Sequence, residues 1–208
     1  MGYDTGSMDS QSMEELEDFD EELVVGNLSA KGELSLQDCM TKTDAAKKAV
    51  ELLAARAFSA MELRKKLLAK CFPANVIDGV LCDLQERGML NDSLYAEAYS
   101  RSRWTSSYWG PRRIKQALYM KGVHQVDAEN AIKTVFEEGE EGDQHLKLGI
   151  SKSSLDKLYV QACKQWLRSE DASRDTRKGR MIRWLQYRGF NWSVVVVILK
   201  KLEAQYPS

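Results

Sequence analysis

Lysine and arginine side chains gather in three short segments of this 208-residue chain, and they are the residues best suited to bind another molecule. Such cations neutralise DNA phosphates or the carboxylates of an acidic protein surface. One basic helix is more often a solvated face that keeps a protein soluble, but recurrence at equivalent positions favours a contact surface. The sequence therefore predicts a partner-binding or DNA-binding role for Arg64, Lys65, Lys66, Lys70, Arg112, Arg113, Lys115, Lys121, Arg177, Lys178, Arg180 and Arg183.

Tryptophans near these segments are further candidates for ligand contact. Trp109 precedes a Gly-Pro break, so we predict an exposed anchor that stacks on bases or enters a protein interface. Trp104 could make the same kind of contact, but it loosely continues the apolar face of Tyr95 and Ala98, and core packing is the alternative for it. For Trp184 and Trp192 the sequence favours packing between repeats over direct contact with a ligand.

Residues typical of catalysis are present, but they do not form catalytic patterns. Ser154 and Lys157 fit the short S-x-x-K pattern without the motifs that accompany it in enzymes. His124 and His145 have no cysteine or serine nearby in a context for nucleophilic catalysis. The four cysteines form no C-x-x-C pair, and the sequence has neither a phosphate loop nor a dinucleotide fingerprint. We therefore predict a non-enzymatic protein with no catalytic residues, no metal site and no cofactor.

The segments that position the basic residues have helical periodicity. Counted from Ser59, Gly110 and Arg177, apolar residues recur at offsets of 4, 8, 13, 22 and 25, and a basic residue stands at offset 11. Ser59 and Glu62 also form a capping-box pattern at the start of a helix. The sequence predicts an all-α fold of about nine helices in tandem three-helix repeats, in an elongated curved arrangement. The helices that open the three repeats are expected at 45–56, 93–104 and 154–168.

Charge and composition divide the chain into five parts. Residues 1–42 contain 11 acidic and 2 basic side chains without helical periodicity, which predicts a disordered acidic arm. Residues 137–153 are predicted to be an acidic linker that contains glycine. The three-helix repeats are then expected at 43–90, 91–136 and 154–208. No apolar run approaches the roughly 20 residues that span a bilayer, so we expect no membrane partner.

Each repeat contains short motifs whose order and spacing form a pattern. The first repeat has Arg56–Leu63 and Lys66–Leu67, the second has Leu90–Ala96, Tyr99, Arg101, Gly110–Ile114, Leu118 and Lys121–Val123, and the third has Arg188–Phe190. No single motif is specific, but together their order and spacing resemble those of the RecX family of regulatory proteins.

The resemblance implies that this chain binds the filament that a RecA-type recombinase forms on DNA, lying in its helical groove. It also implies that the chain inhibits or tunes ATP hydrolysis, strand exchange and co-protease activity, with the ATPase belonging to the partner. We therefore expect a monomer that binds the recombinase filament and, weakly, single- or double-stranded DNA. Arg112, Arg113, Lys115 and Lys121 are the leading contact residues, followed by the basic residues of the first repeat.

Two other functions stay open from the sequence. A helix-turn-helix-like module would place a basic helix in the DNA major groove, and a helical-repeat scaffold would bind an unrelated protein. The acidic arm and linker depart from the compact family pattern and could compete for the same basic faces. They also suggest an organellar form. The expected compartment is the cytoplasm for a bacterial protein, and the plastid stroma or mitochondrial matrix for a eukaryotic one.

Overall fold

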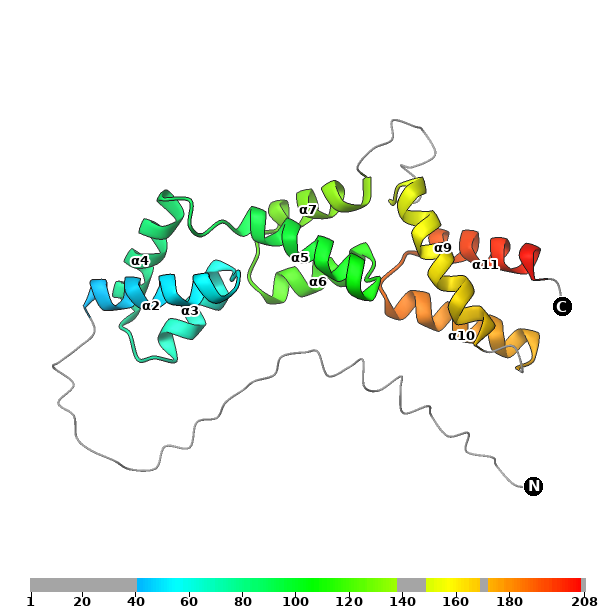
Figure 1. Ribbon diagram of the computed structural model, residues 1–208, viewed down its shortest axis with the longest axis horizontal. Helices are drawn as coiled ribbons and strands as arrows, with labels where there is room; N and C mark the ends of the chain where they lie inside the picture. The colour runs from blue at the N-terminus through cyan, green and yellow to red at the C-terminus, as the bar shows by residue number, and fades with distance from the viewer. Residues whose placement is uncertain (1–40, 138–148, 169–171, 207–208) are drawn as a thin grey trace, which may run out of the picture. The chain divides into compact units, whose positions relative to one another are not determined.

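The computed structural model describes residues 41–137, 149–168 and 172–206, and within these ranges it contains nine α-helices and no strand (Figure 1). The prediction of an all-α protein with tandem three-helix repeats is confirmed. Most of the predicted acidic arm and linker lies outside the described residues. Repeat 1 contains α2 (Lys42–Ala55), α3 (Ala60–Leu68) and α4 (Ala74–Glu86); repeat 2 contains α5 (Asp92–Ser107), α6 (Pro111–Met120) and α7 (Gln125–Glu137); repeat 3 contains α9 (Lys152–Leu167), α10 (Arg174–Tyr187) and α11 (Trp192–Gln205).

Polar side chains fix where most of these helices begin. The predicted capping box of Ser59 and Glu62 is present at α3, and a second one forms between Thr41 and Asp44 at α2. Asn91 and Ser151 cap α5 and α9 through their side-chain oxygens. The opening helix of each repeat therefore starts one to three residues earlier than its periodicity predicts. The spacing of apolar residues shows which residues face the core, but it does not show which polar residue caps the helix.

The middle helix of repeat 3 is longer than its counterparts. The offsets of repeat 3 were counted from Arg177, but α10 begins at Arg174, where the Ser173 side chain caps it by accepting a hydrogen bond from the Thr176 amide. The helix has 14 residues, whereas α3 has 9 and α6 has 10. The extra turn adds Arg174 to the basic residues of this helix.

Apolar side chains form two separate cores. Repeat 1 has its own cluster, which includes Leu63, Leu67 and Ile77. Repeats 2 and 3 share one continuous cluster, in which Trp104 and Trp166 are buried. Each fully buried large apolar side chain contributes about 1.5–3 kcal/mol relative to exposure, so the shared core binds these two repeats firmly together. The boundary between repeats 1 and 2 has no such apolar continuity.

All four tryptophan predictions can be compared with burial in this core. Trp184 is partly buried against it, whereas Trp109 is half-buried against the same core and is not the exposed anchor that was predicted. Trp104 is 6% exposed and packs on Phe136 and Phe190, as expected of a core residue. Trp192 is 56% exposed, so its predicted packing between repeats is wrong. Trp192 is the first residue of α11 and precedes the buried residues of that helix, which begin at Val194. None of the helices in the described ranges is long and apolar enough to cross a membrane.

Candidate interaction surface on the middle helices

The middle helices of repeats 1 and 2 are each positioned by a contact with the following repeat. At the first boundary, the Ser59 hydroxyl donates a hydrogen bond of 2.5 Å to the Lys121 carbonyl oxygen. At the second, the Gly110 amide donates to the Arg188 carbonyl oxygen at 2.6 Å. In both cases the start of a middle helix contacts the turn that follows the middle helix of the next repeat: α3 contacts the turn after α6, and α6 contacts the turn after α10. The same docking geometry therefore occurs twice, and it fixes where the basic side chains lie.

Glycine permits this close approach. Gly122 and Gly189 have φ angles of +75° and +83°, a region that costs other residues about 1–2 kcal/mol. A Cβ atom would lie 2.4 Å from Met61 Cε at Gly122 and 2.5 Å from the Arg113 amide nitrogen at Gly189. The equivalent position of repeat 1 is the exposed Cys71, with a φ of +63°. No repeat precedes it among the described residues, so a side chain meets no docking helix there.

The boundary between repeats 1 and 2 is polar and centres on Glu62. Its carboxylate accepts hydrogen bonds from Lys121 Nζ at 2.7 Å and from the Tyr95 hydroxyl at 2.9 Å. It also closes the capping box by accepting from the Ser59 amide at 3.2 Å. Beside it, the Ala60 amide donates to Asp92 Oδ1 at 2.8 Å. One carboxylate thus joins both repeats and caps α3.

Burial and hydrogen bonding shift the pKa values of this polar junction in different directions. Burial alone raises the pKa of Glu62, but the hydrogen bonds from Lys121, the Ser59 amide and Tyr95 outweigh it and the pKa lies below its usual value. Burial, the adjacent Glu62 charge and the hydrogen bond to Glu62 raise the pKa of the Tyr95 hydroxyl. The pKa of Asp92 is raised, mainly by burial. The junction therefore needs Glu62 ionised.

The boundary between repeats 2 and 3 contains a stack of aromatic rings and guanidinium groups. The Arg113 guanidinium lies 4.0 Å from the Trp109 ring and 4.4 Å from the Tyr187 ring. It also donates to the Tyr187 carbonyl oxygen at 3.4 Å. Arg103 lies 5.0 Å from the same tryptophan ring. Trp109 and Arg113, both predicted contact residues, are half-buried in this stack.

Two further predicted residues form matching ion pairs inside their repeats. Arg64 Nε binds Asp78 Oδ1 at 2.9 Å in repeat 1, and Lys115 Nζ binds Glu129 Oε1 at 2.7 Å in repeat 2. Each pair links the middle helix to the third helix across 14 residues. The hydrogen bond from Arg64 holds the pKa of Asp78 below its usual value. In repeat 3 the corresponding residues are Ile182 and Val196, so an apolar pair replaces the ionic one.

Some basic residues of α10 pack against the rest of repeat 3, and others are exposed. Lys178 Nζ lies 3.1 Å from Glu203 Oε1, and the Arg177 guanidinium lies 5.4 Å from the Trp166 ring. Arg183 donates to the Gly179 carbonyl oxygen of its own helix at 3.4 Å. Arg180 is exposed. The helix therefore holds some of its cations against the rest of repeat 3 and presents others to solvent.

Five of the predicted residues are exposed and have neither an ion pair nor a side-chain hydrogen bond with any other residue that the structure describes. We call them the open cations, and each repeat contributes at least one from its middle helix or the turn that follows. They are Lys65, Lys66, Lys70, Arg112 and Arg180.

The other predicted basic residues have partners that were not predicted from sequence: carboxylates bind Arg64, Lys115 and Lys121, and an aromatic ring contacts Arg113. Asp78 and Glu129 stand at the same offset in two repeats, and this recurrence is a signal that could have revealed their ion pairs. Glu62 was recognised only as a cap, and its bond to Lys121 depends on how two repeats meet. Tyr187 has no comparable sequence signal, because it reaches Arg113 across 74 residues.

Comparison with known proteins assigns each repeat. Family models for the first, second and third three-helix domains of RecX match residues 45–84, 91–132 and 153–198. Regulatory protein RecX of Pseudomonas syringae pv. tomato is 32% identical over 142 residues, which cover 68% of this chain and 81% of that protein. Regulatory protein RecX of Legionella pneumophila (strain Corby) is 28% identical over 167 residues, which cover 79% and 98%.

Solved structures of similar fold agree with this assignment. A crystal structure of RecX from Lactobacillus salivarius has a TM-score of 0.66 and 22% sequence identity, and the match covers 78% of this chain and 97% of that one. A second crystal structure, of regulatory protein RecX, has a TM-score of 0.64 and 21% identity. With all three domain models matched in order, this chain belongs to the RecX family of regulatory proteins.

Proposed function

We propose that this chain is a non-enzymatic regulator that binds RecA-type recombinase filaments on DNA and inhibits their ATPase and strand-exchange activities. The observation that carries the proposal is the recurrence of open cations on the middle helices of three successive repeats. A filament presents repeating carboxylates and DNA phosphates, so repeated weak contacts can add through avidity. The chain would act as a monomer, in the compartment where its recombinase works.

Arg112 and Arg113 are adjacent in the sequence, but of the two side chains only that of Arg113 takes part in the contacts that hold the repeats together. Arg112 is exposed and pairs with no described carboxylate, while Arg113 is held between two aromatic rings at the boundary of repeats 2 and 3. Reversing the charge of Arg113 would disturb that boundary as well as any contact with a partner. A charge-reversal test of binding should therefore change Arg112 and leave Arg113 intact.

The test is the single-stranded-DNA-dependent ATPase of RecA, titrated with the wild-type chain and with a variant carrying Lys66→Glu, Arg112→Glu and Arg180→Glu. We expect the wild type to inhibit. We expect the variant to need at least roughly tenfold more protein for half inhibition, equivalent to about 1.4 kcal/mol of lost binding free energy. The loss should shrink as salt is raised, because exposed charges are screened.

Lys133→Glu is the matched control, since it reverses an exposed cation on α7 that has no ion pair with the described residues. It should inhibit like the wild type. Equal inhibition by the triple variant and the wild type, at equal helicity, would contradict the assignment of the open cations. Fluorescence anisotropy with labelled single- and double-stranded oligonucleotides, without recombinase, measures whether the chain instead binds DNA directly.

A further inference from the structure

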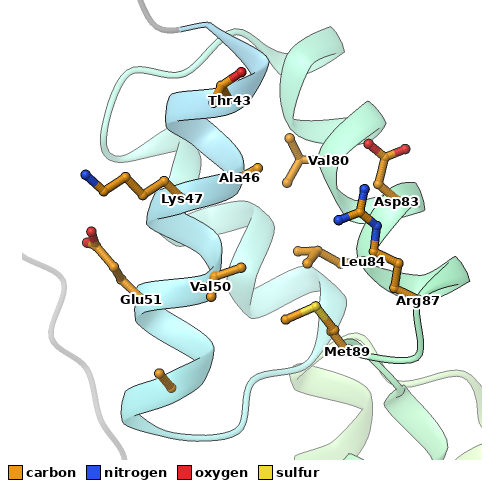
Figure 2. A pocket seen from close by; sticks show the side chains of 11 residues that line it. Thr43, Ala46, Lys47, Val50, Glu51, Val80, Asp83, Leu84, Arg87 and Met89 are labelled. Atoms are coloured by element: carbon orange, nitrogen blue, oxygen red, sulfur yellow. The ribbon is translucent and has the colours of Figure 1, made fainter.

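Repeat 1 has an apolar groove on the side formed by its first and third helices. The groove has a volume of about 570 Å³ and lies between α2 and α4. Figure 2 shows Ala46 and Val50 of α2 facing Val80 and Leu84 of α4 across it, with Met89 at one end. Small side chains on α2 leave space that the larger residues of α4 do not fill.

The groove is open to solvent although its lining is apolar. Val50 is 40% exposed and Met89 is 48% exposed, while Val80 and Leu84 lie beneath them in the core of repeat 1. Exposed apolar surface of this kind costs free energy in water, and a bound apolar side chain would recover about 25 cal/mol for each Å² removed from water. The volume lies within the range of sites that take a small ligand or a few side chains.

Charged side chains at the rim favour an anionic occupant. Two acidic residues line the groove, and each already has a lysine partner from outside it: Asp83 binds Lys42 at 2.7 Å and Glu51 binds Lys48 at 2.8 Å. The two basic residues of the lining, Lys47 on α2 and Arg87 after α4, have no ion pair with any described residue. The rim therefore carries two cations without an ion pair among the described residues, and Lys47 also lies within electrostatic range of Asp44 and Glu51.

We infer that this groove is a docking site for an acidic amphipathic helix of a partner protein. Apolar side chains one turn apart would enter between α2 and α4, and carboxylates on either side of them would pair with Lys47 and Arg87. The lining of α2 extends from Thr43 to Ala54, which corresponds to about 16 Å or three helical turns. A nucleic acid strand fits less well, because its phosphates would lie against an apolar floor.

This surface is distinct from the open cations. Its residues belong to α2, α4 and the turn after α4, whereas the open cations of repeat 1 belong to α3 and the turn after it. The two surfaces can therefore be tested separately. Repeat 1 would contribute an apolar contact of defined shape, while the open cations contribute charge.

The experiment uses the full chain and a fluorescein-labelled helical peptide of about four turns, with leucine at every third or fourth position and glutamate between. Fluorescence anisotropy measures its Kd in the absence of recombinase. We expect saturable binding to the wild type. The pair Lys47→Glu and Arg87→Glu should raise the Kd at least roughly tenfold through like-charge repulsion. Val50→Glu, at an exposed position of the groove, should do the same without loss of helicity.

Two controls test whether binding depends on the groove and on the apolar spacing of the peptide. Lys133→Glu applies the same charge reversal outside the groove and should leave the Kd unchanged, and a peptide of the same composition without the apolar spacing should bind at least tenfold more weakly. The inference is overturned if the peptide does not bind, or if it binds all variants equally. It is also overturned if the chain dimerises in sedimentation experiments and Val50→Glu restores the monomer, since a second copy would then occupy the groove.

Discussion

Gly189→Ala is expected to lower the free energy of unfolding by about 3 kcal/mol, which corresponds to a fall in Tm of roughly 10 °C for a protein of this size. The left-handed backbone at Gly189 contributes about 1 kcal/mol of strain for any residue with a Cβ. The new methyl group would also lie 2.5 Å from the Arg113 amide nitrogen and 2.7 Å from its Cβ. Backbone cannot move aside as a flexible side chain does, so overpacking adds about 1–3 kcal/mol.

Gly88→Ala provides the comparison. Gly88 has a similar φ of +69°, but a Cβ there would meet no atom within 4 Å. Its substitution should therefore cost only the backbone strain of about 1 kcal/mol. Urea unfolding followed by circular dichroism measures both variants. If Gly189→Ala and Gly88→Ala cost the same, the docking of α6 on the turn after α10 does not depend on the absence of a side chain.

The periodicity of the apolar residues predicted the three repeats, because apolar residues recur at the positions that face a core. The turn residues Gly122 and Gly189 aligned correctly at the same offset, and both adopt left-handed backbone. The offsets counted from Arg177 do not give the start of α10, because they assume middle helices of equal length. Ser173 is the local signal that overrides this count, since a capping side chain sets the first helical residue.

The sequence does not distinguish basic residues that are paired inside the chain from those that are open, because the charge of a side chain does not show which residue it contacts. Arg64, Lys115 and Lys121 have the same sequence character as Lys65 and Lys66, yet each of the first three has a carboxylate within 3 Å. Those carboxylates come from a neighbouring helix or repeat. Their proximity depends on helix crossing geometry, which periodicity alone does not contain. The structure therefore divides the predicted contact residues into those with a carboxylate or aromatic partner inside the chain and the open cations.

The two boundaries between repeats are held by different forces. Trp104, Phe136 and Phe190 meet at the second boundary, where the core is continuous. The first boundary has Met61 against Gly122 and a set of polar contacts around Glu62. Apolar burial changes little with pH, whereas hydrogen bonds to a carboxylate depend on its ionisation. The attachment of repeat 1 should therefore be the pH-sensitive one.

Glu62→Gln is expected to weaken this attachment by about 2 kcal/mol at neutral pH. The glutamine removes the charge that Lys121 Nζ and the Tyr95 hydroxyl bind, and leaves the half-buried lysine without its partner. Hydrogen exchange at the Ala60 amide, which donates to Asp92 across the boundary, reports on local opening. Exchange there should be about thirtyfold faster in the variant, while amides within α4 stay protected because repeat 1 keeps its own core.

Acid should produce the same change in the wild type. Because the pKa of Glu62 in the folded protein lies below its unfolded value, its contribution is complete above the unfolded pKa of about 4.3 and is lost as the pH falls through the folded pKa. Asp92 has a raised pKa and acts in the opposite direction, but it is present in both proteins and largely cancels in their difference.

The difference in Ala60 exchange between wild type and Glu62→Gln should therefore shrink toward zero in acid. Asp78→Asn is the matched control, because it neutralises a carboxylate of a largely exposed ion pair within repeat 1. It should leave Ala60 exchange unchanged at every pH. A wild-type-to-variant difference that stays constant from pH 7 into acid would mean that packing of Met61 on Gly122, and not the Glu62 charge, holds repeat 1 in place.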